Sequence, residues 1–352
     1  MYVALSTRAK SIILALVLVI FAAVCNGLPV TKGTTHHPLP TSEVWRLVCS
    51  HERSPVAGIR LSVIEAGSKS WNVIESRTTD DQGRVSLATR PQKDARNIDY
   101  ILKVAYTYEP LVDQGDETPF SVSHENETIN EDSALTEEVL LDDDLRKTGN
   151  ITLAEAPCLA FVNMKRALDD FRKATGRKGH PAGALRLVFS KHIGDTLGSP
   201  FATANTILLP LGYRLSYPTS LHEIGRTVRY ALDGSYAHFV GDLAKFSYTQ
   251  PHSCKQKTNL GFAFTEGWAH YWANSTECFV GHDWIVKKHL LGNDEFAVEG
   301  RVSSALKDLS VRCHGPGDHR KRFYDLLEQH PLAVHSFTEF VKLHQKKYNC
   351  GN

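Results

Sequence analysis

The sequence has no Cys-x-x-Cys pair, no clear excess of one charge and no second long apolar run after residues 12–25. Without a Cys-x-x-Cys pair, a zinc site built from cysteine thiolates is not expected. The run at 12–25 has about 14 residues, whereas a helix needs about 20 to span a bilayer. Arg8 and Lys10 precede the run and small residues follow up to Gly27, so residues 1–27 are predicted to be a secretory signal peptide. An uncleaved membrane anchor is the alternative.

The charges of the remaining chain are balanced. Cleavage after residue 27 removes two of the 40 basic side chains and none of the 39 acidic ones, which leaves a net charge of about −1. Proteins that bind nucleic acid or anionic membranes usually present a basic surface. Neither is therefore expected as a partner, and the mature protein is predicted to be secreted, extracellular and free of the membrane. About 325 residues suffice for two domains, each with its own core.

Several features are typical of a secreted protein. Six cysteines follow residue 27, and an even number in a secreted chain predicts three disulfides, with fifteen possible pairings. We expect one of these disulfides to be Cys254–Cys278, which would bracket the segment that contains Glu266. Three Asn-x-Ser/Thr sequons are predicted glycosylation sites, at Asn126, Asn150 and Asn274.

The first structured region, 45–112, is predicted to be a β-sandwich. Apolar and polar residues alternate at 59–64 and at 84–87, as in half-buried strands. Turns of the form Pro-x-x-Gly at 55–58 and Asp-x-x-Gly at 80–83 resemble those of the transthyretin-like sandwich found beside secreted peptidase domains. A generic immunoglobulin-like sandwich is the alternative. Either one would be a packing or recognition module without catalytic groups.

Two segments on either side of this region lack strong structural signals. Residues 28–44 have no periodicity and are expected to form a flexible leader. Residues 113–150 are acidic and poor in aromatics, which favours a solvated linker or a sheet edge. A calcium loop is not expected there, because no EF-hand spacing is present.

The last region, 151–352, is predicted to be mainly helical with a small sheet, so the whole chain is predicted to be α+β. Apolar residues recur at helical spacing after Pro157, and the segments 184–189 and 205–210 are expected to be strands. A helix, then strands, then a helix that carries histidine is the order found in zinc peptidases of the zincin type. In such enzymes a strand beside the active-site helix binds extended substrate by strand addition.

The histidine helix is predicted to have Pro218 in its first turn and to stop at Gly234. It contains His222-Glu223-Ile224-Gly225-Arg226, one residue short of the zinc-peptidase pattern His-Glu-x-x-His. Residues four apart share one helix face, which is why that pattern makes two zinc ligands and sets its glutamate beside the metal as general base. The alternative is that Ser220-x-x-Glu223 is only a capping box.

A second segment supports the zinc-peptidase interpretation of residues 222–226. Residues 261–273 read Gly-Phe-Ala-Phe-Thr-Glu-Gly-Trp-Ala-His-Tyr-Trp-Ala. This resembles the gluzincin helix Asn-Glu-Gly-(Trp/Phe)-Ala-x-(Tyr/Phe), whose glutamate is the third zinc ligand. The resemblance to gluzincin metallopeptidases runs from about residue 155 to the C-terminus. It implies that His222 is the first zinc ligand, Glu223 the general base and Glu266 the third ligand, while Thr265 replaces the usual Asn.

Arg226 departs from the family pattern at the second zinc ligand. A guanidinium has no lone pair to donate and stays protonated, so it cannot coordinate zinc. It can instead form a two-pronged ion pair with Glu266 or Glu223. The sequence therefore predicts an inactive gluzincin-like pseudopeptidase, without a bound cofactor, that keeps a cleft for a peptide or protein partner.

Two other functions remain open. In the first, the chain is an active zinc peptidase in which His270, four residues after Glu266 and on the same helix face, joins His222 and Glu266 as a substitute ligand. Further candidates for a ligand or for oxyanion stabilisation are His238, His252, Tyr230 and Tyr271. In the second, the chain is a secreted β-sandwich recognition protein whose helical half is a scaffold.

Overall fold

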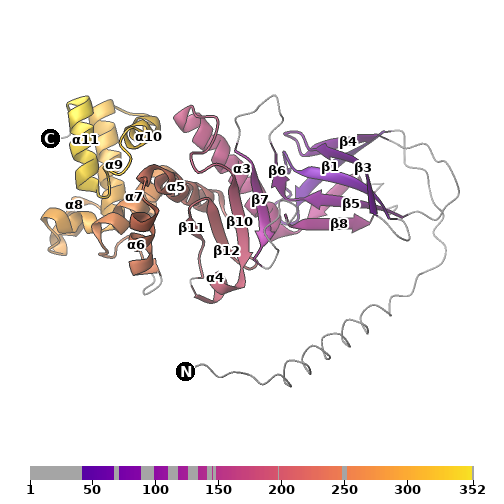
Figure 1. Ribbon diagram of the computed structural model, residues 1–352, viewed down its shortest axis with the longest axis horizontal. Helices are drawn as coiled ribbons and strands as arrows, with labels where there is room; N and C mark the ends of the chain where they lie inside the picture. The colour runs from indigo at the N-terminus through magenta and orange to yellow at the C-terminus, as the bar shows by residue number, and fades with distance from the viewer. Residues whose placement is uncertain are drawn as a thin grey trace, which may run out of the picture. The chain divides into compact units, whose positions relative to one another are not determined.

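The computed structural model describes residues 42–66, 71–88, 99–109, 118–125, 134–140, 145, 148–196, 198–247 and 252–350. The predicted signal peptide, most of the predicted leader and the Asn126 sequon lie outside these residues. The described residues form both helices and strands, which confirms the predicted α+β class (Figure 1).

The N-terminal strands form two small sheets. The first has the order β4-β1-β9, with β1 at Ser42–Cys49, β4 at Arg84–Ala88 and β9 at Asn150–Leu153. The second has the order β3-β2-β5-β8, with β2 at Arg60–Ala66, β3 at Trp71–Thr78, β5 at Asp99–Ala105 and β8 at Thr136–Leu140. Strand β8 comes from the acidic segment 113–150 and is an edge strand of its sheet.

Alternation along the strands explains which faces are buried. In β4, Val85 and Leu87 are buried while Arg84 and Ser86 are exposed. Side chains two apart in a strand point to the same face, so this pattern directs one face into the core. In β2 the register against β3 shifts after Val63, and both Val63 and Ile64 are buried.

The described residues also form a third sheet, with the order β11-β12-β10-β7-β6. Its strands are β6 at Thr107–Tyr108, β7 at Phe120–His124, β10 at Leu185–Ser190, β11 at Phe201–Thr203 and β12 at Thr206–Pro210. Strands β10 and β12 confirm the two strands expected near 184–189 and 205–210. Strand β7 was not foreseen, because it lies inside the acidic segment yet pairs in parallel with β10.

The helices are α3 at Glu155–Thr175, α4 at Lys191–Thr196, α5 at Tyr217–Asp233, α6 at Tyr236–Ser247, α7 at Leu260–Ala273, α8 at His282–Lys287, α9 at Glu299–His314, α10 at Arg320–Glu328 and α11 at Phe337–Tyr348, with 3-10 turns η3 at Thr276–Cys278 and η4 at Gly292–Ala297. Helix α5 has Pro218 in its first turn and ends at Gly234, as predicted. Its cap is Ser216, whose hydroxyl accepts from the Thr219 amide. The capping-box interpretation of Ser220 is therefore wrong: Ser220 is buried inside the helix.

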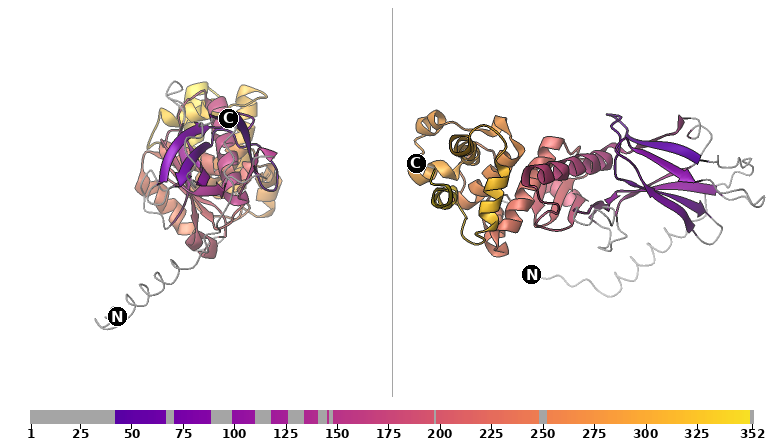
Figure 2. Two further views of the ribbon diagram at one scale, coloured as in Figure 1. Left: turned by 90° about the vertical axis from the view of Figure 1, so that its right-hand side faces the viewer. Right: turned by 90° about the horizontal axis from the view of Figure 1, so that it is seen from above.

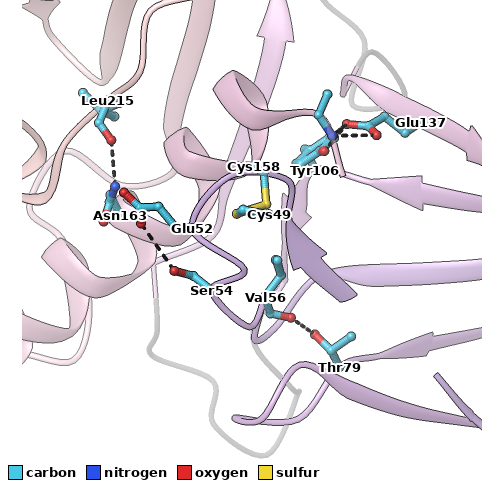
Figure 3. The surroundings of a disulfide bond; sticks show 11 residues. Cys49, Glu52, Ser54, Val56, Thr79, Tyr106, Glu137, Cys158, Asn163 and Leu215 are labelled. Atoms are coloured by element: carbon cyan, nitrogen blue, oxygen red, sulfur yellow. Dashed lines mark hydrogen bonds between the residues drawn. A yellow bond between two sulfur atoms is a disulfide. The ribbon is translucent and has the colours of Figure 1, made fainter. Parts of the chain in front are cut away.

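Helix α3 connects the N-terminal sheets to the histidine helix. Its Cys158 forms a disulfide with Cys49 at the end of β1 (Figure 3). One turn further along, the Asn163 amide donates to the carbonyl of Leu215, just before α5 (2.7 Å). One buried cluster runs through all these elements, from Trp45 in β1 to Phe161 in α3 and onward into α5 and α7.

Glycines allow the helices around the histidine helix to approach closely. A Cβ on Gly225 of α5 would lie 2.9 Å from the Cα of Ala269 in α7. A Cβ on Gly267 of α7 would lie 2.6 Å from the Cβ of Val302 in α9. The contacting helices can be followed from another side in Figure 2. None of the helices in the described residues combines the length and apolar character needed to cross a bilayer.

Candidate functional site

The two sequence segments singled out above meet in the structure. Helix α5 contributes His222, Glu223 and Arg226, and α7 contributes Glu266. We call these four residues the Arg226 cluster. The close crossing of the helices at Gly225 and Ala269 brings His222 Nε2 to 3.2 Å from Glu266 Oε2. A carboxylate only accepts, so the imidazole donates.

Arg226 lies between the two carboxylates of the cluster. Its Nη1 donates to Glu223 Oε2 at 3.4 Å, and its Nε forms an ion pair with Glu266 Oε1 at 3.1 Å. Arg226 and Glu223 are 3% exposed and Glu266 is 0% exposed. The guanidinium also lies over the ring of Phe201 in β11, with its Cζ 4.9 Å from the ring centroid. The charges are thus held out of water, where an unpaired carboxylate would be costly.

The burial of the cluster makes the ionised groups depend on one another. Burial by itself would lower the pKa of Arg226, but the carboxylates of Glu266, Glu223 and Glu299 outweigh it and raise that pKa. Burial opposes ionisation of Glu266, yet the Arg226 guanidinium and the hydrogen bond from His222 hold its pKa well below the usual range. Each partner therefore keeps the other charged.

A further carboxylate, Glu299 in the first turn of α9, extends the cluster and was missed in the sequence. It is fully buried, with Oε1 accepting from His252 Nδ1 at 2.9 Å and Oε2 at 3.6 Å from His270 Nε2. No motif surrounds Glu299; only the packing of Gly267 against α9 brings it here. Burial would lower the pKa of His252, but its hydrogen bond to Glu299 and the charge of Glu266 raise it, which favours the imidazolium.

His270, the possible substitute ligand of the alternative interpretation, lies near the cluster. Its ring centroid is 4.5 Å from that of His222. Burial and the neighbouring His222 lower its pKa, so the neutral imidazole is favoured. A different set, His252, Glu266 and Glu299, offers one ligand atom from each residue, all within 4.8 Å of one another.

The residues of the Arg226 cluster do not fit the zinc ion that the gluzincin resemblance implies. Arg226 directs a permanent positive charge at both Glu223 and Glu266, the residues expected to serve as base and third ligand. A guanidinium cannot donate a lone pair, and its positive charge repels a dication placed beside Glu223 and Glu266. The carboxylates of the cluster therefore form ion pairs with the guanidinium of Arg226.

The other residues expected from the sequence are spread over the described chain. Tyr230 packs edge-on against Phe239, and Tyr271 lies against Phe323. Cys254 and Cys278 are bonded to each other, the pairing expected from the sequence, and Cys313 is bonded to Cys350. Two sequon residues are exposed: Asn150, at the start of β9, and Asn274, after α7. His238 lies on α6 beside Asp233 and His335.

Strand β11 is the element of the third sheet that lies nearest the Arg226 cluster. It pairs antiparallel with β12 on one side, and no other strand of the described residues pairs with its opposite side. Its Phe201 contacts Arg226, so β11 lies alongside α5 (Figure 1).

No family model and no curated protein matches this chain. Among solved structures, a 9R-lipoxygenase from Cyanothece PCC8801 is matched at 14% sequence identity over 40% of this chain, with a TM-score of 0.19. The match spans 20% of the length of that lipoxygenase. A TM-score of 0.19 is too low to indicate a shared fold.

Proposed function

We propose that this chain is a secreted, non-catalytic relative of gluzincin-type zinc peptidases that binds an extended peptide or protein segment. In this proposal the two N-terminal sheets correspond to a transthyretin-like sandwich, and the described part of residues 151–352 corresponds to a zincin-like domain. The carrying observation is the position of Arg226. Its guanidinium pairs with Glu223 at 3.4 Å and with Glu266 at 3.1 Å, the residues that the resemblance assigns to base and ligand.

The loss of catalysis follows from the chemistry of the cluster. In a zinc peptidase the general base accepts a proton from a water molecule that the metal polarises. Here Glu223 is instead paired with the positive charge of Arg226, which also repels a metal ion. The position of β11 beside α5, at the end of the strand order of the third sheet, supports the retained binding function, because binding of an extended peptide to a sheet by main-chain hydrogen bonds needs no metal. Binding there would be governed by shape and by the residues beside β11.

Zinc analysis of the wild type and of four variants of the full chain tests the proposal. Arg226→His supplies the missing ligand and is expected to bind one zinc ion per chain more than the wild type, and the double variant R226H/H222A is expected to lose that additional ion. Arg226→Gln is the matched control: it removes the charge without supplying an imidazole, so it is expected to gain no zinc. If the wild-type chain holds zinc that H222A removes, or if R226H gains none, the proposal is wrong.

An active zinc peptidase with an altered ligand set is the second candidate. It is favoured by His252, Glu266 and Glu299, whose ligand atoms lie within 4.8 Å of one another, and by His270 beside His222. In that case the wild-type chain binds zinc and cleaves peptides, and His252→Ala abolishes both. Under the first proposal, His252→Ala leaves the zinc content unchanged.

A further inference from the structure

A second group of histidines and carboxylates lies at the far end of helix α5. Asp233 is the last residue of α5, His238 and Asp242 lie one turn apart on α6, and His335 lies just before α11. His335 Nδ1 is 3.1 Å from Asp233 Oδ1. His238 Nδ1 is 3.8 Å from Asp233 Oδ2 and 3.7 Å from Asp242 Oδ2. We call these four residues the α5-end cluster.

The contacts of His335 place an unprotonated ring nitrogen, Nδ1, opposite the carboxylate of Asp233 when the ring is neutral. Its Nε2 is 3.1 Å from the carbonyl of Leu332, which can only accept, so Nε2 carries the proton. In the neutral ring Nδ1 then holds a lone pair that points at a carboxylate oxygen. A cation, either a second proton or a metal ion, is needed between them.

His238 brings a second imidazole to the same carboxylates. Its Nδ1 lies between the carboxylates of Asp233 and Asp242, and its ring centroid is 3.7 Å from that of His335. Two imidazolium rings at this separation would repel each other. One divalent cation bound to both Nδ1 atoms removes the repulsion and satisfies the carboxylates together.

The carboxylate of Asp233 provides independent support for a bound cation, because one of its buried oxygens makes no hydrogen bond within the described residues. Asp233 is 2% exposed, and this oxygen is Oδ2. Its Oδ1 is held by Arg229 Nη2 at 2.6 Å, and Arg229 also donates to the carbonyl of Val334. These contacts orient the carboxylate so that Oδ2 points toward His238, as outer contacts orient a metal ligand.

Asp233, His238 and His335 each offer one ligand atom, and these three atoms lie within 4.8 Å of one another. Ligands of zinc lie about 2.1 Å from the ion and therefore about 3.4 Å from one another. Three contacts of the α5-end cluster are near that spacing: His335 Nδ1 is 3.1 Å from Asp233 Oδ1, and His238 Nδ1 is 3.8 Å from Asp233 Oδ2 and 3.7 Å from Asp242 Oδ2. Imidazole nitrogens with carboxylate oxygens suit zinc, whereas calcium and magnesium prefer oxygen alone. The C-terminus of α5 also favours a cation there.

The cluster is open to an ion from outside. His238, Asp242 and His335 line a cavity of about 540 Å³. Glycine at position 261 in the first turn of α7 leaves room for the Asp242 carboxylate, because a Cβ there would lie 1.8 Å from Asp242 Oδ2. We propose that Asp233, His238, Asp242 and His335 bind one zinc ion, which joins α5, α6 and the segment before α11.

Metal titration of the purified full chain tests this site. After dialysis against a chelator, the wild-type chain is expected to bind one Zn²⁺, to show the visible spectrum of tetrahedral Co²⁺ and to melt at a higher temperature with Zn²⁺. His238→Ala and Asp242→Asn are expected to weaken Zn²⁺ binding at least about 100-fold. His282→Ala, which removes an exposed imidazole on α8, is the matched control and is expected to change nothing.

The outcomes separate this site from the Arg226 cluster. Loss of Zn²⁺ in H238A but not in H222A supports the α5-end site and leaves the proposed pseudopeptidase intact. Loss in H222A instead overturns both. No Zn²⁺ binding by the wild-type chain beyond that of H238A overturns the α5-end site alone. His238 is 41% exposed on its side chain, so H238A is expected to fold, and His238→Asn keeps a polar side chain as a second variant.

Discussion

Replacing Arg226 by Met removes the positive charge of the Arg226 cluster while keeping a long side chain. It leaves Glu223 and Glu266, 3% and 0% exposed, without their cation. Removing one partner of a buried ion pair costs about 3–5 kcal/mol, because the remaining charge is left out of water. We therefore expect R226M to lower the free energy of unfolding by about that amount at pH 7.5. The double variant R226M/E266Q should recover part of the loss.

The loss should depend on pH through Glu266. In the wild type its pKa is lowered below 4.5, so its contribution to stability is present above pH 4.5 and is lost as the pH falls through the lowered pKa. Without Arg226, the largest influence that lowers that pKa is lost while burial, which raises it, remains, so we expect the pKa of Glu266 to be higher in R226M than in the wild type. The carboxyl of the variant then becomes neutral as the pH falls through the raised pKa, and its penalty disappears. The difference between R226M and the wild type is expected to be largest near pH 8 and to shrink towards pH 5.

Urea unfolding followed by tryptophan fluorescence measures both effects, because Trp268 and Trp272 are buried in α7 beside the cluster. Arg77→Met is the matched control, since its ion pair with Glu75 is exposed on the arginine side and is worth less than about 1 kcal/mol. A loss in R226M no larger than in R77M, or an equal loss at pH 5 and pH 8, would refute the buried-pair reasoning.

Two further predictions concern the surroundings of α5. Burial lowers the pKa of His180 from 6.5 to about 3, and the neutral ring is bonded to Thr227, so the free energy of unfolding should fall as the pH decreases from 6.5 to 3, by up to about 5 kcal/mol. His180→Gln should lose that part of the pH dependence in urea titrations. Gly225→Ala should cost about 1–3 kcal/mol, because its Cβ would lie 2.9 Å from Ala269 Cα.

Each of these predictions has a clear counter-result. An unfolding free energy that depends on pH equally in H180Q and in the wild type would show that His180 is not the titrating group. For the glycine, the control is Gly241→Ala on α6, where a Cβ meets no atom of the described chain within 4 Å. It is expected to stabilise by about 0.5–1 kcal/mol, through the higher helix propensity of alanine. Equal effects at the two glycines would contradict the tight helix crossing.

Features that depend on neighbouring residues could be predicted from the sequence without the fold. The limits of α5 follow from Pro218 and Gly234, and strands β10 and β12 follow from short apolar runs, because helix ends and strand periods depend on neighbouring residues. The inability of Arg226 to bind zinc is likewise a property of one side chain. By contrast, β7 lies within an acidic stretch of the sequence, and it forms a strand through parallel pairing with β10.

Contacts between distant residues depended on packing that no local pattern encodes. Glu299 joins the Arg226 cluster only because α9 packs against Gly267, and His335 reaches Asp233 from 102 positions away. Helix periodicity says which face of a helix is apolar, but not which other helix covers it or at what height. The residue types of both clusters were therefore visible in the amino-acid order, whereas their pairing arose from the way the helices cross.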